Sequence, residues 1–399
     1  MGSKMEELTN LGSSVIMNTY GRFPVALDYG DGVYMYDVEG KKYIDFVAGI
    51  AVNSLGTNHE RLVSAISEQA KKLIHCSNLY YTEPQISLAK ALTENSDFDK
   101  VFFCNSGAEA VESALKLMRK YADMKGKPGK EIITMEKSFH GRTYGAVTAT
   151  GQDKYHKGFG PLLPGIKHVK YNDFEALESQ VSEKTCGILM EVMQGEGGII
   201  PADAKYLKKV RELCDEKDIL LVFDEVQTGV GRTGELFAYQ LFGVAPDGAT
   251  FAKGLAGGVP IGAFMANDKA ASAFKPGDHA STFGGNPLAT AAAGVVLDEL
   301  LNRGLLENVK KQGKYLNEKL LKLQEKHKVI TDVRGIGLMQ GVELSVAVGD
   351  IISECIKKGL FLVGAGPNVI RFVPPLIIKE ENIDEAMGIL DSALTEKGL

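Results

Sequence analysis

Hydrophobic residues follow two different spacings along the chain, and together these predict an α/β fold. The runs at residues 33–36 and 43–46 are strand-like and flank Glu39-Gly40, a sequence that suits a hairpin turn. From residue 61 to residue 73 the apolar positions Leu62, Ile66 and Leu73 follow a helical spacing. The first segment is therefore expected to form a small β unit followed by a helix.

Short, continuously apolar runs then alternate with helical stretches. The runs lie at residues 101–104, 131–134, 187–190 and 219–223. Strands without polar alternation are typical of a mostly parallel sheet that helices cover on both faces. Ligands of such sheets bind at the carboxyl ends of the strands, so the residues directly after each run are the first candidates for a site.

The C-terminal part of the chain predicts a second, smaller α+β unit. Residues 287 to about 326 are helical in pattern; strands follow at 329–333, 339–344 and 369–373, and helices at 350–358 and 381 to about 397. A chain of 399 residues is also too long for one ordinary core. We predict an N-terminal segment (1–54) that contributes to the small domain, a large domain (55–290), and a connector helix with the C-terminal small domain (291–399).

Composition narrows the class of protein. The net charge is -6 and the charges are mixed along the chain, so no nucleic-acid partner is expected. No apolar stretch approaches the roughly 18 residues of a membrane span, and residues 1–10 lack the apolar core of a signal peptide. The five cysteines are scattered and contain no C-x-x-C pair, which argues against a disulfide framework or a zinc site. A cytoplasmic protein is expected.

Two residues at predicted strand ends carry the first chemical signal. Asp224 follows the run at 219–223, where a carboxylate can cap a loop or act as the fixed anion that keeps a pyridine nitrogen protonated. Lys253 lies in the run TFAKG at residues 250–254, among apolar residues and glycines. Desolvation lowers the pKa of a lysine and makes it a nucleophilic amine able to form a Schiff base. Together they favour pyridoxal phosphate (PLP) chemistry over a loop cap and a surface lysine.

Two further runs supply the context for a phosphate and an aromatic ring. The run NSGAEA at residues 105–110 lies between a predicted strand and a predicted helix, where backbone N–H groups bind phosphate. Ser-Gly before a helix is by itself more often a cap, but Asp224 and Lys253 favour the phosphate interpretation. The run FHGR at residues 139–142 offers an aromatic face beside a guanidinium; the alternative is a packed Phe and a structural Arg.

One motif points to a different cofactor and is rejected. The run GVGRTG at residues 229–234 matches the G-x-G-x-x-G pattern of dinucleotide-binding proteins. Residues 224–228 separate it from the strand that it should follow directly. Asp247 lies at the expected distance, yet residues 242–246 are a poor second strand to deliver it.

At these residues the chain closely resembles the class III (ω-amino acid) aminotransferases, and within them the acetylornithine aminotransferases. The similarity runs from about Asn18 to the last predicted helix. Five segments match in order, at residues 105–110, 139–142, 221–234, 251–262 and 281–287. The resemblance implies a fold-type I PLP enzyme with small amino and keto acids as substrates. It also implies a homodimer that builds two shared active sites at the subunit interface.

The same resemblance implies a role for each matched residue. Lys253 should form the Schiff base with PLP, and Asp224 should pair with the pyridine nitrogen. Gln227 should hydrogen-bond the ring oxygen, and Phe139 and Val226 should pack on the two faces of the ring. Ser106, Gly107 and Ala108 should hold the phosphate, and Thr282 should reach the phosphate of the neighbouring subunit. Arg142 should bind the substrate carboxylate that is distant from the reacting amine. Arg371 should bind the α-carboxylate of 2-oxoglutarate, with Glu196 as its switching partner. Tyr20 should lie near a substrate carboxylate.

The implied reaction moves the terminal amino group of N-acetylornithine to 2-oxoglutarate, a step of arginine biosynthesis. Ornithine-specific relatives carry an aromatic residue where this chain has Gly49, and the small residue leaves room for an acylated α-amine. Succinylornithine, ornithine and 4-aminobutyrate remain alternative donors. A PLP aminomutase, which needs no external keto acid, and a non-enzymatic binding protein of the same fold also remain open.

Overall fold

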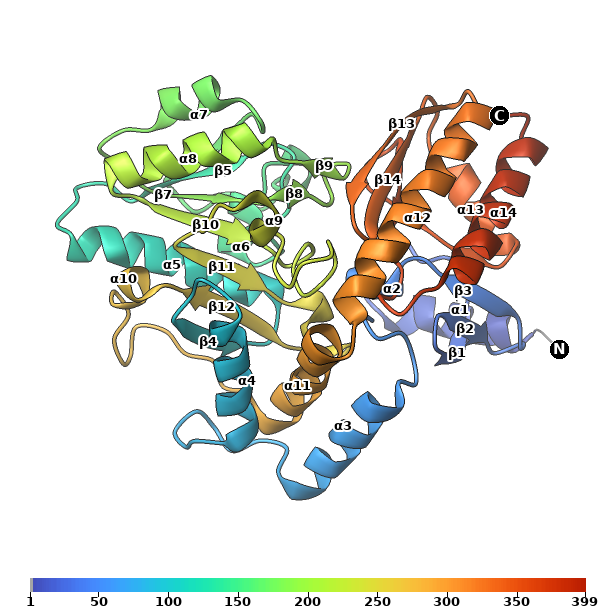
Figure 1. The fold of residues 1–399 in the computed structure, drawn as a ribbon, viewed down its shortest axis with the longest axis horizontal. Coiled ribbons are helices and arrows are strands. Elements are labelled where there is room, and N and C mark those ends of the chain that lie inside the picture. Colours follow the sequence, from blue (N-terminus) through green and yellow to red (C-terminus); the bar gives the residue numbers. More distant parts are fainter. Residues whose placement is uncertain (1–2) are drawn as a thin grey trace.

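A seven-stranded sheet forms the centre of the larger part of the molecule (Figure 1). The computed structural model describes residues 3–399, so the first two residues of the predicted N-terminal segment lie outside the described residues. The strands, in spatial order, are β4 (Lys100–Cys104), β12 (Gly262–Ala266), β11 (Gly248–Phe251), β10 (Leu220–Asp224), β7 (Thr185–Met190), β5 (Glu131–Met135) and β6 (Ile166–Val169). Strand β12 runs opposite to the other six strands, which are parallel to one another. The predicted mostly parallel sheet is confirmed.

Helices cover both faces of this sheet, as the unbroken apolar runs predicted. Every residue of β7 and β10 is buried. Successive side chains of a strand point to opposite faces, and in β10 Val222 packs in the core cluster of α5 (Gly107–Met124). Its neighbours Leu221 and Phe223 belong to the core cluster that includes α8 (Ala204–Lys217). Helix α7 (Phe174–Gln180) lies beside α8, and α5 lies on the other side of the sheet (Figure 1).

Two long helices lead from the larger part to the smaller one. Helix α11 (Pro287–Asn302) begins at Asn286, whose side chain accepts a hydrogen bond from the Ala289 N–H at 2.9 Å. It ends before Gly304, whose positive φ of 76° breaks the helical path. Helix α12 (Leu305–Lys326) then crosses into the smaller part (Figure 1). The helical stretch predicted from residue 287 to about 326 is therefore two helices with a glycine between them.

The smaller part holds two four-stranded sheets. One has the order β13 (Ile330–Ile336), β14 (Met339–Leu344), β17 (Val369–Phe372), β16 (Val363–Gly364), and it is accompanied by α13 (Gly349–Lys357) and α14 (Glu380–Glu396). The other joins β1 (Leu27–Asp31), β2 (Tyr34–Asp37) and β3 (Lys42–Asp45) to β15 (Leu360–Phe361). The β2–β3 hairpin was predicted. The pairing of β15 with β3 supports a contribution of residues 1–54 to the small domain, and the domain boundaries stay predictions.

The remaining elements lie between those already described or at the N-terminus. They are α1 (Lys4–Val15), α2 (Ala48–Ala51), α3 (Glu60–Lys72), α4 (Glu83–Glu94), α6 (Tyr144–Ala149), α9 (Tyr239–Phe242), α10 (Asp268–Ala271), β8 (Met193–Gln194), β9 (Ile200–Pro201) and the 3-10 turns η1 (Asp153–Tyr155) and η2 (Lys253–Ala256). The sequence pattern did not predict α1, which buries none of its residues. Within residues 3–399, no helix combines the length and hydropathy that a membrane crossing requires.

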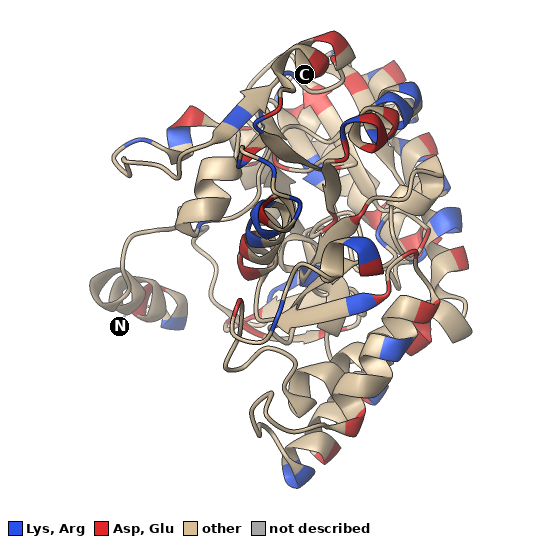
Figure 2. Ribbon diagram, turned by 90° about the vertical axis from the view of Figure 1, so that its left-hand side faces the viewer, with Lys and Arg blue, Asp and Glu red and all other residues tan. Residues whose placement is uncertain are grey.

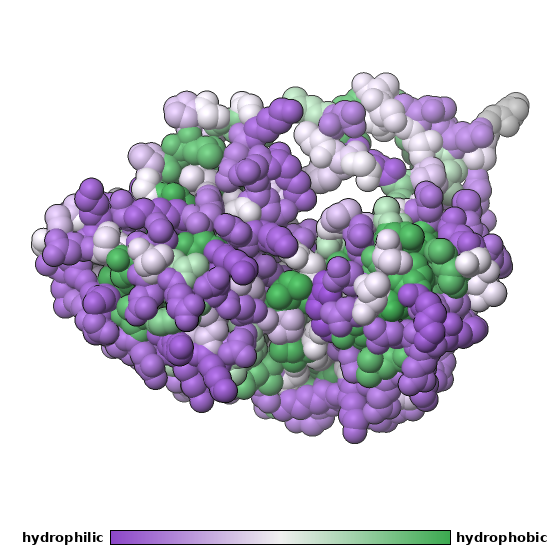
Figure 3. Space-filling model, turned by 90° about the horizontal axis from the view of Figure 1, so that it is seen from above, coloured by the Kyte–Doolittle hydropathy of each residue, from purple (hydrophilic) through white to green (hydrophobic). Residues whose placement is uncertain are grey.

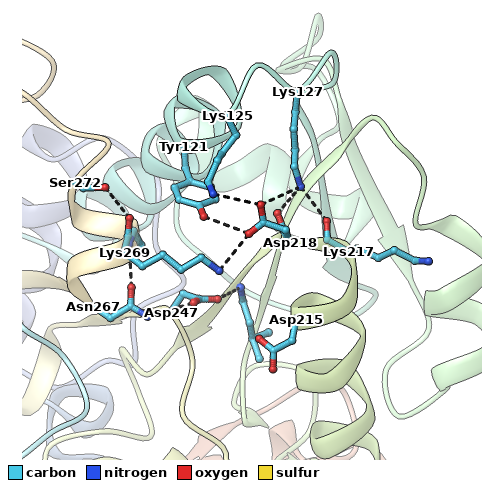
Figure 4. Close-up of polar contacts among 12 residues, drawn as sticks. Tyr121, Lys125, Lys127, Asp215, Lys217, Asp218, Asp247, Asn267, Lys269 and Ser272 are labelled. Carbon is cyan, nitrogen blue, oxygen red and sulfur yellow. Dashed lines mark hydrogen bonds and ion pairs between the residues drawn. The ribbon is translucent and has the colours of Figure 1, made fainter.

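A group of charged side chains ties together helices on one flank of the large sheet (Figure 4). Asp218 ends α8 in a left-handed conformation, with φ at 47°. Its carboxylate pairs with Lys269 of α10 at 3.3 Å and Lys125 after α5 at 3.6 Å, and it accepts a hydrogen bond from the Tyr121 hydroxyl at 3.3 Å. Exposed pairs of this kind contribute about 0–1 kcal/mol each. Elsewhere on the surface Lys and Arg are interspersed with Asp and Glu (Figure 2).

Candidate active site

A cavity of about 370 Å³ lies where β10 and β11 end and α5 begins. It is at the carboxyl edge of the parallel strands, where such sheets bind their ligands. The sequence-predicted residues that line it are Ser106, Gly107, Ala108, Phe139, Glu196, Asp224, Val226, Gln227 and Lys253. They come from five separate stretches of the chain, so the fold brings them together. The volume suits a small organic cofactor.

Asp224 is a buried and tightly oriented anion at the end of β10. Its Oδ1 accepts hydrogen bonds from the Val226 N–H at 3.0 Å and the Thr250 hydroxyl at 3.1 Å. Its Oδ2 lies 2.7 Å from Nδ1 of His140, which is also buried. Burial lowers the pKa of His140, but the Asp224 carboxylate outweighs it, so the pKa is raised overall. The carboxylate therefore faces the cavity in one fixed orientation.

Lys253 begins the turn η2 directly after β11 and Ala252. Its φ of 42° is left-handed, which is strained for a residue with a side chain. Burial, followed by the positive charge of Arg371, lowers the pKa of its ammonium to about 8. This is the desolvation expected from its apolar and glycine neighbours. The neutral, nucleophilic fraction of the amine near neutral pH is therefore far larger than that of an ordinary lysine, although the ammonium form still predominates at pH 7.

The start of α5 forms an anion-binding end of the cavity. Ser106 caps the helix, and its hydroxyl oxygen accepts from the Glu109 N–H at 3.2 Å. The N–H groups of Gly107 and Ala108 belong to the first turn, where a helix offers them no carbonyl partner. A Cβ on Gly107 would lie 2.7 Å from Val226 Cγ1, so only glycine permits this close approach. The strand-to-helix turn that the sequence predicted as a phosphate-binding position is therefore present, with free N–H groups at the start of the helix.

Glu191 is a buried carboxylate that the sequence reasoning missed. It accepts hydrogen bonds from the Phe139 N–H at 3.0 Å and from the Gly195 N–H at 2.9 Å. It therefore ties the loop of Phe139 to the glycine-rich loop that carries Glu196. Burial raises the pKa of Glu191 to about 7. Its signal was available, because Glu191 directly follows the apolar run that became β7.

Arg371 lies on β17, in the sheet of β13, β14, β17 and β16, and its side chain contacts residues that line the cavity. It is only 1% exposed, and its Nη1 lies 2.5 Å from Glu196 Oε1 and 3.0 Å from Gln227 Oε1. Its Nη2 donates to the Gly364 carbonyl at 3.4 Å, and among the described residues its buried Nε has no hydrogen-bond partner. Burial raises the pKa of Glu196, but the charge of Arg371 outweighs it, so the pKa is lowered overall. The two form a buried ion pair beside the cavity.

The other predicted residues lie outside the cavity lining. Arg142 is exposed, and its guanidinium carbon lies 4.0 Å from the ring centre of Tyr155 and 5.4 Å from that of Phe139. Thr282 and Tyr20 are exposed, and Tyr20 is 70% accessible. Neither Thr282 nor Tyr20 lines the cavity of its own chain.

The comparisons with known proteins agree with this geometry. The family model described as aminotransferase class-III matches residues 15–394. The chain belongs to this family. It is 57% identical over 383 residues to the acetylornithine aminotransferase of Caldanaerobacter subterraneus subsp. tengcongensis, covering 96% of this chain and 97% of that protein. It is 53% identical over 386 residues to that of Clostridium acetobutylicum, covering 96% and 100%.

Solved structures show the same fold. The N-acetylornithine aminotransferase of Stenotrophomonas maltophilia superimposes with a TM-score of 0.84 at 39% identity, over 97% of this chain and 98% of that one. The ornithine aminotransferase of Toxoplasma gondii gives 0.95 at 32% identity, over 100% and 96%. The predicted fold-type I architecture is confirmed. The cofactor of this class III aminotransferase is PLP.

The residues at the cavity fit PLP. The free N–H groups at the start of α5 suit its phosphate, and the fixed Asp224 carboxylate suits a protonated ring nitrogen. The Lys253 amine lies in the same lining, and Phe139 and Val226 supply apolar surface for a flat ring. Anion site, carboxylate and amine are the three groups that hold such a cofactor.

The rejected dinucleotide motif has a structural role in this aminotransferase. Arg232 of the run GVGRTG is buried and donates to the carbonyls of Leu338 at 3.0 Å and Pro374 at 2.5 Å. It thereby joins the large part of the chain to the segments flanking β14 and β17. Asp247 accepts from Arg211 at 2.9 Å and from the Leu221 N–H at 2.9 Å. Neither residue lines the cavity.

Proposed function

We propose that this enzyme transfers the terminal amino group of N-acetylornithine to 2-oxoglutarate, giving N-acetylglutamate semialdehyde and glutamate in arginine biosynthesis. The observation that carries the proposal is the buried Arg371 guanidinium paired with Glu196 beside the cavity. An arginine whose partner is a movable side chain suits a pocket that must accept a second carboxylate in only one half-reaction. The names of the relatives and the small Gly49 support N-acetylornithine as the donor.

Two residues act at the reacting centre. PLP, when bound, supplies an electron sink for the carbon that carries the amine. The neutral amine of Lys253, favoured by its lowered pKa near 8, accepts the proton from that carbon. Asp224 holds a proton at the ring nitrogen, and its three hydrogen bonds keep the carboxylate in place without reorganisation.

Six residues bind the rest of the cofactor. Ser106, Gly107 and Ala108 hold the phosphate at the helix start. Phe139 and Val226 would supply the apolar surfaces for the two faces of the ring, and Gln227 would bind the ring oxygen. Because Gln227 Oε1 accepts from Arg371, its amide nitrogen is the group that remains to donate.

Three charged residues sort the substrates by their carboxylates. N-Acetylornithine has one carboxylate, far from its terminal amine, and Arg142 binds it. 2-Oxoglutarate has a second carboxylate close to the reacting carbon, and Arg371 binds that one after Glu196 moves away. While the donor is bound, Glu196 stays paired, so the buried guanidinium is never left without an anion. Tyr20 contributes to the carboxylate end of the pocket.

The active enzyme is a homodimer with shared active sites, and it works in the cytoplasm. Thr282 would bind the PLP phosphate of the neighbouring subunit, and the exposure of Thr282 and Tyr20 in the single chain supports this. The face seen from above in Figure 3 is mostly hydrophilic. Most of the large exposed apolar side chains lie in two parts of the chain. One is the N-terminal segment from Leu8 to Tyr29; the other comprises residues near α3 and α4 and in the loop of Thr282: Leu73, Ile74, Leu79, Tyr80, Tyr81, Ile86 and Phe283. All five cysteines are free, which suits a reducing compartment.

A panel of amine donors tests the proposal. N-Acetylornithine, succinylornithine, ornithine and 4-aminobutyrate are assayed with and without 2-oxoglutarate. We expect the highest kcat/KM with N-acetylornithine, and turnover only when 2-oxoglutarate is present. Preference for ornithine or 4-aminobutyrate would contradict the donor, and steady turnover without a keto acid would indicate an aminomutase instead.

A further inference from the structure

The guanidinium of Arg142 is held by aromatic rings alone. It lies 4.0 Å from the ring centre of Tyr155, well within the range of a cation–π contact, and 5.4 Å from that of Phe139. Within residues 3–399 its side chain makes no hydrogen bond and no ion pair. Arg371 is the opposite case, because its guanidinium donates to three acceptors. The N–H groups of Arg142 are therefore all available to a ligand.

Tyr155 has a fixed position from which to hold Arg142. It ends the turn η1, and its N–H donates to the Gln152 carbonyl at 3.0 Å. The next residue, His156, anchors this segment because its Nε2 lies 2.9 Å from the Val147 carbonyl and 2.8 Å from that of Thr150. The Tyr155 ring also packs edge-on against Phe139, with centroids 5.6 Å apart and planes at 77°. The ring thus contacts both a cofactor-stacking residue and the substrate arginine.

We propose that Tyr155 is a specificity-determining positioning residue whose ring holds Arg142 ready for the carboxylate of the amine donor. This rests on the proposed function in taking Arg142 as the carboxylate-binding group. Stacking occupies the face of a guanidinium and leaves the N–H donors at its edge free for a bidentate contact. An exposed arginine otherwise loses rotamer freedom when it binds, and holding it in place beforehand reduces that cost.

In this proposal the aromatic face of Tyr155 positions Arg142. Two variants distinguish this role of the ring from simple apolar packing. Tyr155→Phe keeps the ring, and Tyr155→Leu keeps apolar bulk but removes the ring. Tyr315→Leu is the matched control, because Tyr315 lies under the Lys319 ammonium at 4.9 Å on α12, outside the cavity lining. From the usual strength of such contacts, Tyr155→Leu should weaken carboxylate binding by about 2- to 30-fold.

Two ligands measure the effect in the holoenzyme. N-Acetylnorvaline carries the carboxylate and acylated amine of the donor but lacks the terminal amine, so its Kd is measured without turnover. N-Acetylputrescine carries the reactive amine but no carboxylate. We expect Tyr155→Leu to raise the Kd of N-acetylnorvaline and the KM of N-acetylornithine by that factor, with little change in kcat. Tyr155→Phe and Tyr315→Leu should match the wild type, and N-acetylputrescine kinetics should not change in any variant.

Several results would overturn the proposal. They are an unchanged Kd in Tyr155→Leu, equal losses in the Phe and Leu variants, or equal losses with N-acetylputrescine. If the wild type fails to turn over N-acetylornithine, the proposed donor is wrong, but the role of Tyr155 is still decided by a crystal structure of Tyr155→Leu. There we expect the Arg142 guanidinium to leave its position beside Phe139, and an unmoved guanidinium would count against positioning.

Discussion

Replacing Glu196 by alanine is expected to turn the enzyme away from N-acetylornithine and toward glutamate. In the wild type, an α-amino donor must displace the Glu196 carboxylate from Nη1 of Arg371, 2.5 Å away, before its own carboxylate can bind. Glu196→Ala removes that competitor. The uncompensated guanidinium should also attract the single carboxylate of N-acetylornithine to the wrong end of the pocket, so the rate with this donor should fall.

The size of the shift follows from the contact that is removed. A hydrogen bond to a charged group contributes about 1.5–3 kcal/mol net. At about 1.36 kcal/mol for each factor of ten, glutamate should bind about 10- to 160-fold more tightly. The Glu196 side chain is 24% exposed, so water competes for it and the lower half of that range is expected.

Stopped-flow measurement of each half-reaction separately is the suitable assay. The ratio of kcat/KM for glutamate to that for N-acetylornithine should rise in Glu196→Ala, and Glu196→Gln, which keeps an acceptor without the charge, should lie between it and the wild type. Arg371→Ala should damage the 2-oxoglutarate half-reaction much more than the donor half-reaction. Equal losses in both half-reactions would refute the switch.

Three further outcomes are expected. Asp224→Asn should retain PLP but lose most of its turnover, because the ring nitrogen loses its anion; a near-wild-type kcat would exclude this role. The rate at which apoprotein captures PLP should rise with pH and reach half its maximum near pH 8, since only the neutral Lys253 amine attacks; a midpoint near the ordinary lysine value of 10.5 would contradict the effect of burial. Mixing inactive Lys253→Ala and Thr282→Ala chains should restore activity after subunit exchange, because one site of each mixed dimer carries neither change; no recovery despite verified exchange would count against shared sites.

The sequence predicted those strands whose residues are apolar at every position because both of their faces are buried. Strands β7 and β10 are buried on both faces, so their apolar runs were visible, and the rule of strand ends led to Asp224. Strand β12 was missed because it contains small residues where other chain segments approach closely. A Cβ on Gly262 would lie 2.4 Å from the Ser106 carbonyl oxygen. The small residues of such a strand are required by contacts with segments far away in the sequence, and a local hydrophobic pattern carries no information on those contacts.

The same limit applies to the site. The lysine, the aspartate and the helix start each had a local signal, but the contacts that orient them join residues far apart in the chain. His140 meets Asp224 from another strand end, and Arg371 meets Glu196 from a different sheet. Only the resemblance to known aminotransferases pointed to the Arg371–Glu196 pair, and nothing in the sequence pointed to the stacking of Arg142 on Tyr155.

The central claim is that Lys253 holds PLP at the end of β11, and borohydride reduction followed by peptide mass mapping tests it most directly. Reduction of the wild-type holoenzyme should fix one cofactor per chain on the peptide that contains Lys253. Lys253→Ala should fix none. Cofactor fixed at stoichiometric yield in Lys253→Ala, or on a different lysine of the wild type, would contradict the account.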